Sequence, residues 1–166
     1  YTGALSVLRT IMSYDYLWNN VRVKGGAYGC MNNYTRTGAG YMMSYRDPNL
    51  DKTNQIFEES ADYVEQFEVS ERDMTKYIIG TVSNLDTPLN PNAKGARSMS
   101  AWLQGLKEET VQRERDQVLT CESKDIRALA PYLKAVLSQN HLCVIGNEAK
   151  LEEQKTLFGT VRNLFH

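Results

Sequence analysis

The stretch LWNNVRVKGGAYG, at residues 17–29, marks the place where a helix gives way to extended chain. Upstream of it, apolar residues from Leu5 to Tyr16 recur close to the period of an amphipathic helix, which we predict at about residues 4–18. The glycine pair at 25–26 ends any regular element, because glycine is unfavourable inside helices and strands. The stretch therefore predicts a helix, a tight turn and the start of a strand in quick succession.

Two alternating segments follow this turn and predict a β-hairpin. Residues 27–34 and 41–46 each place alternate side chains on opposite faces, and residues 35–40 between them carry two glycines. A third, short buried strand is predicted at residues 141–145, where it is ended by a Gly-Asn pair. Three strands are few for a chain with so many helical segments, so we expect further sheet partners from elsewhere.

Most of the remaining chain has the apolar spacing of amphipathic helices. We expect one helix after the Asp47-Pro48 opening, another after a Ser70 cap, and a third that is split by Pro131. The predicted helices and their buried residues are residues 50–67 (Leu50, Thr53, Phe57, Ala61, Val64, Phe67), 71–85 (Met74, Ile78, Thr81, Leu85), 96–106 (Ala96, Met99, Leu103, Leu106), 109–119, 121–136 (Ile126, Leu129, Leu133, Val136) and a final helix (Leu151, Leu157, Val161, Leu164).

The composition is that of one globular domain over residues 1–166. The chain has 42% hydrophobic and 23% charged residues, which excludes a disordered or collagen-like polypeptide. A net charge of −1 gives no general attraction to nucleic acid or anionic lipid, and the apolar runs are too short to span a bilayer as a helix. The three cysteines show no CxxC pairing and are interpreted as reduced thiols of an intracellular protein. Because the sequence opens on Tyr1 within a helical pattern, we expect a piece of a longer polypeptide.

Several kinds of site are excluded by residue spacing. His141 and His166 lie too far apart for HExxH or HxxEH, which place two imidazoles on one helix face beside a glutamate. The cysteines lack zinc-ligand spacing. The glycines satisfy neither the GxGxxG nor the P-loop pattern. We therefore predict that this chain contains no metal and no phosphate-binding loop.

The opening stretch carries a resemblance to a known family. Together with PNAKG at residues 91–95 and CVIGNE at 143–148, it resembles the C-terminal half of the insulinase (pitrilysin) zinc peptidases, closest to the presequence-protease branch. The resemblance covers nearly the whole chain. It implies an α+β fold, a two-layer α/β sandwich in which helices cover a mainly antiparallel sheet whose N-terminal strands lie before Tyr1. It also implies that Zn²⁺ is bound in the N-terminal half of the same polypeptide and that this unit holds none.

The resemblance assigns two accessory catalytic and substrate-binding residues, Arg22 and Tyr28. They would hold the substrate carbonyl and stabilise the tetrahedral intermediate. A permanently charged guanidinium and a neutral phenol can both donate to a developing oxyanion. From the residue types alone the alternative is favoured, in which Arg22 pairs with a local acid and Tyr28 is a half-buried strand aromatic. The resemblance favours the catalytic interpretation.

Three hypotheses of function follow. The first is the C-terminal, non-zinc unit of an intracellular peptidase that degrades short unstructured peptides and is inactive as an isolated fragment. The second is a non-catalytic structural or binding subunit of the same fold. The third is an RNA-binding module, based on the excess of basic residues and tyrosines in residues 1–46, and we favour it least.

For the first hypothesis we expect the following partners and location. The partners are the N-terminal half of the same polypeptide and a peptide substrate, with neither nucleic acid nor membrane. An exposed sheet edge should also favour self-association. The expected location is the cytoplasm, or the mitochondrial matrix in a eukaryote.

Overall fold

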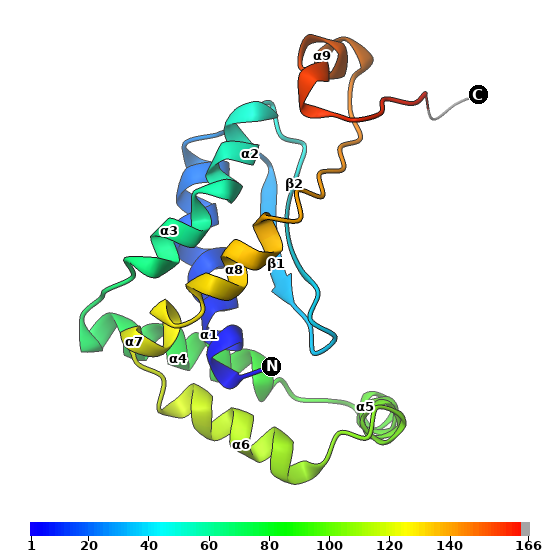
Figure 1. Ribbon diagram of the computed structural model, residues 1–166. Helices are drawn as coiled ribbons and strands as arrows, with labels where there is room; N and C mark the ends of the chain where they lie inside the picture. The colour runs from blue at the N-terminus through cyan, green and yellow to red at the C-terminus, as the bar shows by residue number, and fades with distance from the viewer. Residues whose placement is uncertain (164–166) are drawn as a thin grey trace.

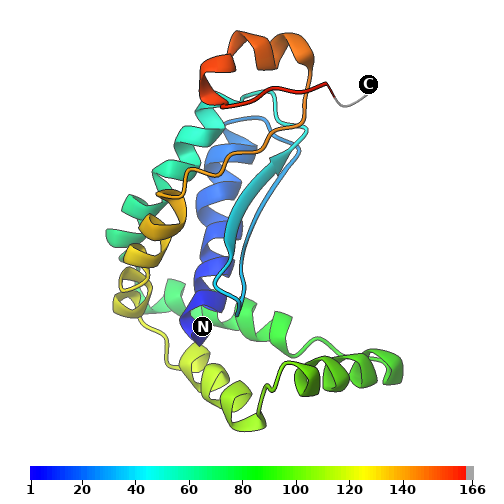
Figure 2. The ribbon, with the colours of Figure 1, turned by 45° about the vertical axis from the view of Figure 1, so that its right-hand side comes forward.

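A long N-terminal helix forms the centre of the molecule. In the computed structural model, which describes residues 1–163, α1 (Gly3–Ile11) continues through two π-helical segments, η1 (Met12–Tyr16) and η2 (Trp18–Val23) (Figures 1 and 2). The helical stretch therefore runs to Val23 rather than to the predicted end at residue 18. The reason is apolar burial, because Val21 is fully buried and extends the core stripe beyond the predicted end.

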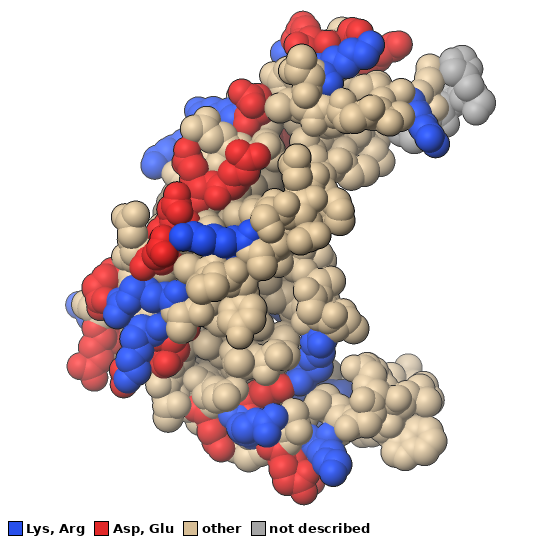
Figure 3. All heavy atoms as spheres, viewed as in Figure 1, with Lys and Arg blue, Asp and Glu red and all other residues tan. Residues whose placement is uncertain are grey.

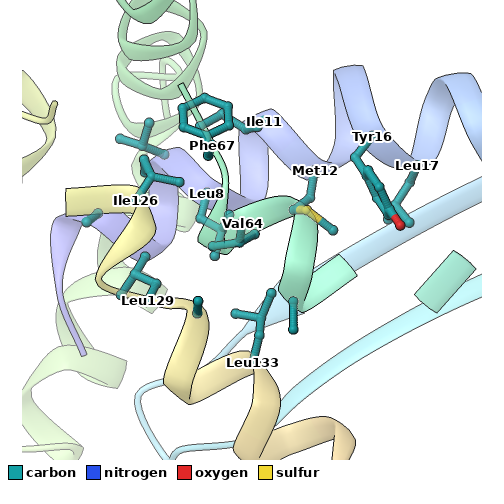
Figure 4. Close-up of a cluster of buried hydrophobic side chains, with 14 of the residues drawn as sticks. Leu8, Ile11, Met12, Tyr16, Leu17, Val64, Phe67, Ile126, Leu129 and Leu133 are labelled. Carbon is teal, nitrogen blue, oxygen red and sulfur yellow. The ribbon is translucent and has the colours of Figure 1, made fainter. Parts of the chain in front are cut away.

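The core forms where this helix meets segments that are distant in sequence. Figure 4 shows side chains of the N-terminal helix pointing toward those of the later helices. The buried cluster includes Leu8, Ile11, Met12, Leu17, Val64, Phe67, Ile126, Leu129 and Leu133. Of the residues predicted to be buried in the helices after Asp47-Pro48 and around Pro131, most belong to this core, whereas Leu50 and Val136 are only partly buried and lie outside it.

The predicted hairpin is confirmed and lies against the N-terminal helix. Strands β1 (Gly29–Tyr34) and β2 (Gly40–Tyr45) pair antiparallel, and Met31 lies opposite Met43. On the inner face, the buried Asn32 donates from Nδ2 to Ser13 Oγ at 2.9 Å. In the described residues the sheet has two strands, so the α+β class is confirmed, whereas a larger two-layer sheet is not seen.

Six further helices lie where helices were predicted, except that the single helix expected at residues 50–67 is divided into two, of which the first begins at Asp51. They are α2 (Asp51–Glu58), α3 (Ser60–Glu65), α4 (Glu71–Leu85), α6 (Glu108–Leu119), α7 (Ser123–Arg127) and α8 (Ala130–Leu137). Ser70 caps α4 as predicted, since its Oγ accepts from the Asp73 N–H at 3.2 Å. Pro131 lies in the first turn of α8 and separates it from α7. Across the described residues, no helix is both long and apolar enough to cross a membrane.

Helix α5 (Pro91–Leu103) is present, but its predicted burial is wrong. None of its residues is buried, and Met99, Trp102 and Leu103 are 62%, 79% and 68% exposed. Figure 2 shows it projecting from the rest of the molecule. The apolar period identifies a stripe on a helix but not the surface that covers it, and nothing in the described residues covers this one.

The predicted strand at residues 141–145 is also wrong. This segment has no regular secondary structure and pairs with no strand among the described residues, and Ile145 is 76% exposed. A strand needs a hydrogen-bonding partner, and here none is at hand. The final helix is shorter than predicted: α9 (Glu148–Glu153) is followed by a 3-10 turn, η3 (Lys155–Leu157). Val161 lies beyond both, and Leu164 lies outside the described residues.

Candidate functional site

Arg22 lies near the end of the long helix, in η2, and is partly buried. Its guanidinium stacks on the ring of Trp18, with the central carbon 4.0 Å from the ring centroid. Among the described residues it has no acidic partner within ion-pair distance. The expected alternative, a local ion pair, is therefore not what holds this side chain, and its N–H donors remain available.

Tyr28 lies just before β1 and is 59% exposed. Its backbone N–H donates to the Arg46 carbonyl at 3.2 Å, and its ring meets the edge of the Tyr45 ring at a centroid distance of 5.5 Å. The hydroxyl has no hydrogen-bond partner among the described residues. Tyr28 is thus an exposed side chain with an unused donor, rather than the half-buried strand aromatic of the alternative.

A tight turn brings Arg22 and Tyr28 to the same end of the molecule. The Gly26 N–H donates to the Arg22 carbonyl at 2.9 Å, and Gly26 has φ +80°, which favours glycine. A Cβ at Gly25 would lie 2.4 Å from the Val21 carbonyl oxygen. Both glycines are therefore needed for this tight turn. Because the turn is so short, the first strand starts beside the end of the helix.

The charge of Arg22 also extends to the inner side of the hairpin. Burial raises the pKa of the Cys30 thiol, whereas the Arg22 guanidinium acts in the opposite direction and the Asp47 carboxylate raises it further. This places Arg22 within electrostatic range of the start of β1. The hydroxyl of Tyr28 and the guanidinium of Arg22 are accordingly two separate donors at one end of the sheet.

Sequence reasoning missed the side chains that surround this pair. Trp18, Tyr45 and Arg46 each contact Arg22 or Tyr28 through a ring. A signal was present for Trp18, because a residue four positions before Arg22 lies on the same side of a helix. For Arg46 no such signal exists, because its contact depends on the hairpin register.

The described residues contain no group of three or more His, Cys, Asp or Glu side chains that could hold a metal ion. His141 is exposed, and Cys30, Cys121 and Cys143 are free thiols. His166 lies outside the described residues. The donor set seen here therefore does not fit a zinc site.

Charge is unevenly distributed over the surface. Figure 3 shows acidic and basic side chains along the side built by α2, α3 and α7, whereas the hollow between α9 and α5 is lined mainly by uncharged atoms. The outward face of the hairpin carries partly exposed methionine and tyrosine side chains, namely Met31, Tyr41, Met43 and Tyr45. This face extends along the sheet from the end of the molecule at which Arg22 and Tyr28 lie.

A pocket of about 470 Å³ lies away from this end, and Arg36, Glu114, Asp86 and Arg115 contribute to its lining. These charges pair with one another: Arg36 with Glu114, and Arg115 with Asp86 at 2.5 Å. These four charged groups are committed to each other, and we assign no chemistry to the pocket.

Comparison with known proteins gives consistent matches. The family described as PreP C-terminal domain matches residues 1–148. Protein HypA of Clostridium perfringens (strain 13 / Type A) is 42% identical over 164 residues, which cover 99% of this chain and 17% of that protein. Presequence protease 1, chloroplastic/mitochondrial, of Arabidopsis thaliana is 37% identical over 135 residues, covering 81% of this chain and 12% of the relative. Presequence protease, mitochondrial, of Mus musculus is 30% identical over 147 residues, covering 88% and 14%. The chain therefore spans less than a fifth of the length of these relatives.

Proposed function

This chain belongs to the PreP C-terminal domain family, and from that premise we propose that it is the C-terminal, non-zinc unit of a zinc metallopeptidase that degrades short unstructured peptides. The resemblance of residues 17–29 to presequence proteases is confirmed by the family match and by relatives of that name. Those relatives are peptidases by name, which supports a hydrolase as the parent protein.

One observation carries the proposal: the partly buried Arg22 and the exposed Tyr28 lie at the same end of the molecule and have donors that no described residue uses. Fixed donors aimed at developing negative charge lower the barrier of peptide hydrolysis. Arg22 would supply a permanent positive charge and Tyr28 a neutral O–H to the carbonyl oxygen of the scissile bond. Both would thus hold the substrate carbonyl and stabilise the tetrahedral intermediate.

Zn²⁺ would be bound outside this chain, in the N-terminal half of the same polypeptide. There it would polarise the scissile carbonyl and activate water. No residue of this chain is assigned as a ligand, because the described residues hold no suitable donor cluster. We infer that the isolated chain does not hydrolyse peptides and that it acts only together with that half.

The remaining inferences concern context. We propose that residues 1–166 are one domain whose two-stranded sheet is completed to a two-layer α/β sandwich by strands from the rest of the polypeptide. We place the protein in the cytoplasm, or in the mitochondrial matrix if its source is a eukaryote, since several relatives are named mitochondrial. The partners are the N-terminal half and a peptide substrate, without nucleic acid or membrane.

A non-catalytic structural or binding subunit is the second candidate. The exposed apolar side chains of α5, Met99, Trp102 and Leu103, favour it, because such patches mark protein interfaces. The two candidates differ in the rest of the polypeptide. An HxxEH motif upstream would favour the peptidase, and its absence would favour the binding subunit.

Replacing Tyr28 by Phe in the full-length polypeptide tests the catalytic proposal. Loss of one oxyanion donor lowers kcat by roughly 10²–10³-fold, and we expect a loss of this order with a short unstructured peptide. Because the hydroxyl bonds to no described residue, Tm and zinc content should stay near wild type.

The matched control is Tyr132→Phe, since Tyr132 is a similarly exposed tyrosine on α8. It should leave kcat unchanged. Unchanged turnover in Tyr28→Phe would falsify the catalytic assignment, whereas a loss confined to KM would make Tyr28 a substrate-positioning contact.

A further inference from the structure

Arg46, the residue that follows β2, is held against Tyr28 in two ways. Its guanidinium carbon lies 5.3 Å from the centroid of the Tyr28 ring, within the range of a cation–π contact. Its carbonyl accepts the Tyr28 N–H at 3.2 Å. The backbone bond thus fixes the two residues side by side, and the side chain of one covers the ring of the other.

The backbone of Arg46 adopts a conformation that its residue type disfavours. Its φ is +49°, in the left-handed region, and among the described non-glycine residues only Asn140 shares this sign. Asparagine tolerates this region, whereas a long side chain without a local hydrogen bond gains nothing there. A disfavoured conformation that persists next to a candidate site is a reason to examine its role.

The guanidinium of Arg46 is not committed to an acid. It is exposed, and it forms no ion pair with any described residue. The adjacent Asp47 is otherwise engaged, because its carboxylate accepts from the Asn49 N–H at 2.9 Å and from Thr53 Oγ1 at 2.8 Å. The Tyr28 ring is therefore the partner that the structure gives to this charge.

We propose that Arg46 is a positioning residue that fixes the orientation of the Tyr28 ring, and this rests on the proposed function of Tyr28. An exposed phenol with a free hydroxyl can adopt several rotamers, and a donor helps catalysis only when it is held in the productive direction. Arg46 over the ring and Tyr45 at its edge restrict that freedom. Arg46 acts through Tyr28 and does not itself touch the reacting atoms.

The test is a double-mutant cycle in the full-length polypeptide with Arg46→Gly and Tyr28→Phe. Glycine accepts the left-handed backbone, so Arg46→Gly removes the guanidinium while Tm stays equal or rises. We expect kcat for a short unstructured peptide to fall about 3- to 10-fold with KM nearly unchanged. In the Tyr28→Phe background, where no hydroxyl remains to be oriented, Arg46→Gly should cause no further loss.

Two further variants sharpen the test. Arg46→Lys keeps the charge but not the planar group, and it should recover only part of the lost kcat. Arg72→Ala is the matched control, since Arg72 is an exposed arginine on α4 without an ion pair among the described residues, and it should change nothing.

Three outcomes would overturn the inference. An unchanged kcat in Arg46→Gly shows that Arg46 positions nothing. Losses that multiply in the double variant show that Arg46 acts on the substrate independently of Tyr28. If Tyr28→Phe alone has full turnover, the proposed function of Tyr28 fails together with the inference, whereas the first two outcomes leave that function intact.

Discussion

At the scale of single residues, the feature that bears on function is the pair of hydrogen-bond donors of Arg22 and Tyr28, which no described residue uses. Several charged groups elsewhere form ion pairs, such as Arg115 with Asp86 and Lys134 with Glu65 at 2.7 Å. Arg22 and Tyr28 differ because their described neighbours are rings rather than hydrogen-bond acceptors. Rings fix a side chain in place and leave its polar atoms free for a ligand.

The three cysteines should differ in reactivity toward iodoacetamide. The thiolate is the nucleophile, so a raised pKa lowers the reactive fraction near neutral pH. Burial raises the pKa of Cys121 to about 12 and also raises the pKa of the half-buried Cys30, whereas Cys143 is exposed. We expect Cys143 to react first, Cys30 next and Cys121 last at pH 8, as followed by peptide mass spectrometry.

Raising the pH should speed the alkylation of Cys30, because it increases the thiolate fraction. Unfolding in guanidinium is the control, since it should bring all three cysteines to similar rates. A native protein in which Cys121 reacts as fast as Cys143 would contradict the burial of Cys121.

The sequence identified the candidate pair only through the family resemblance. Residue types alone favoured an ion pair between Arg22 and a local acid, which the structure does not show among the described residues. They also could not indicate Arg46, because its contact with Tyr28 depends on a positive φ and on hairpin register. Neither quantity can be read from a local pattern.

Helices and strands were predictable wherever local chemistry and the core agree. The Ser70 cap, the Pro131 break and the two-glycine turn all act within a few residues, and each is seen. The predictions for helix α5 and for residues 141–145 were wrong for one common reason. Their apolar side chains imply a covering surface or a strand partner, and the described chain supplies neither.

Substitution of Trp102 should therefore leave the stability of this chain nearly unchanged. The side chain is 79% exposed, so Trp102→Ser removes little buried surface and should change the free energy of unfolding by less than about 0.5 kcal/mol. Leu133→Ala, in the core, should cost about 2–5 kcal/mol. Urea titrations of both variants give the comparison.

A loss for Trp102→Ser as large as that for Leu133→Ala would show that α5 is buried in solution after all. In the full-length polypeptide the same substitution should become costly if the rest of the protein covers α5. The pair of measurements therefore separates an intrinsic property of this chain from one that depends on its context.

The whole chain has two unlike sides. Its charged side is formed by helices, and its hollow, mainly uncharged side carries the hairpin, with α5 and α9 at either end (Figures 2 and 3). The chain spans 12–17% of the length of the relatives described above. Most of a protein of their length therefore lies outside this chain and is available to contact the hollow, mainly uncharged side. The α+β class was predictable from the sequence, whereas the further strands that could pair with the hairpin were not identifiable, because a sheet is a property of all its strands.

The hairpin should cause this chain to self-associate when it is studied alone. The outer edges of β1 and β2 have no strand partner in the described part of the protein, and unpaired edges recruit other chains. We expect a concentration-dependent dimer or larger species in sedimentation velocity. Upstream residues that complete the sheet should reduce it.

Two matched substitutions locate the contact. Met43→Lys places a charge on β2, where Met43 is 40% exposed, and charged edge residues, especially lysine, block strand pairing. Met99→Lys places the same charge on the exposed face of α5. If the sheet edge is responsible, Met43→Lys should shift the protein to monomer while Met99→Lys leaves the association unchanged. The reverse result would assign the contact to α5. A wild-type chain that stays monomeric at high concentration would contradict the prediction, because it would show that the unpaired edges of the hairpin do not recruit a strand from another chain.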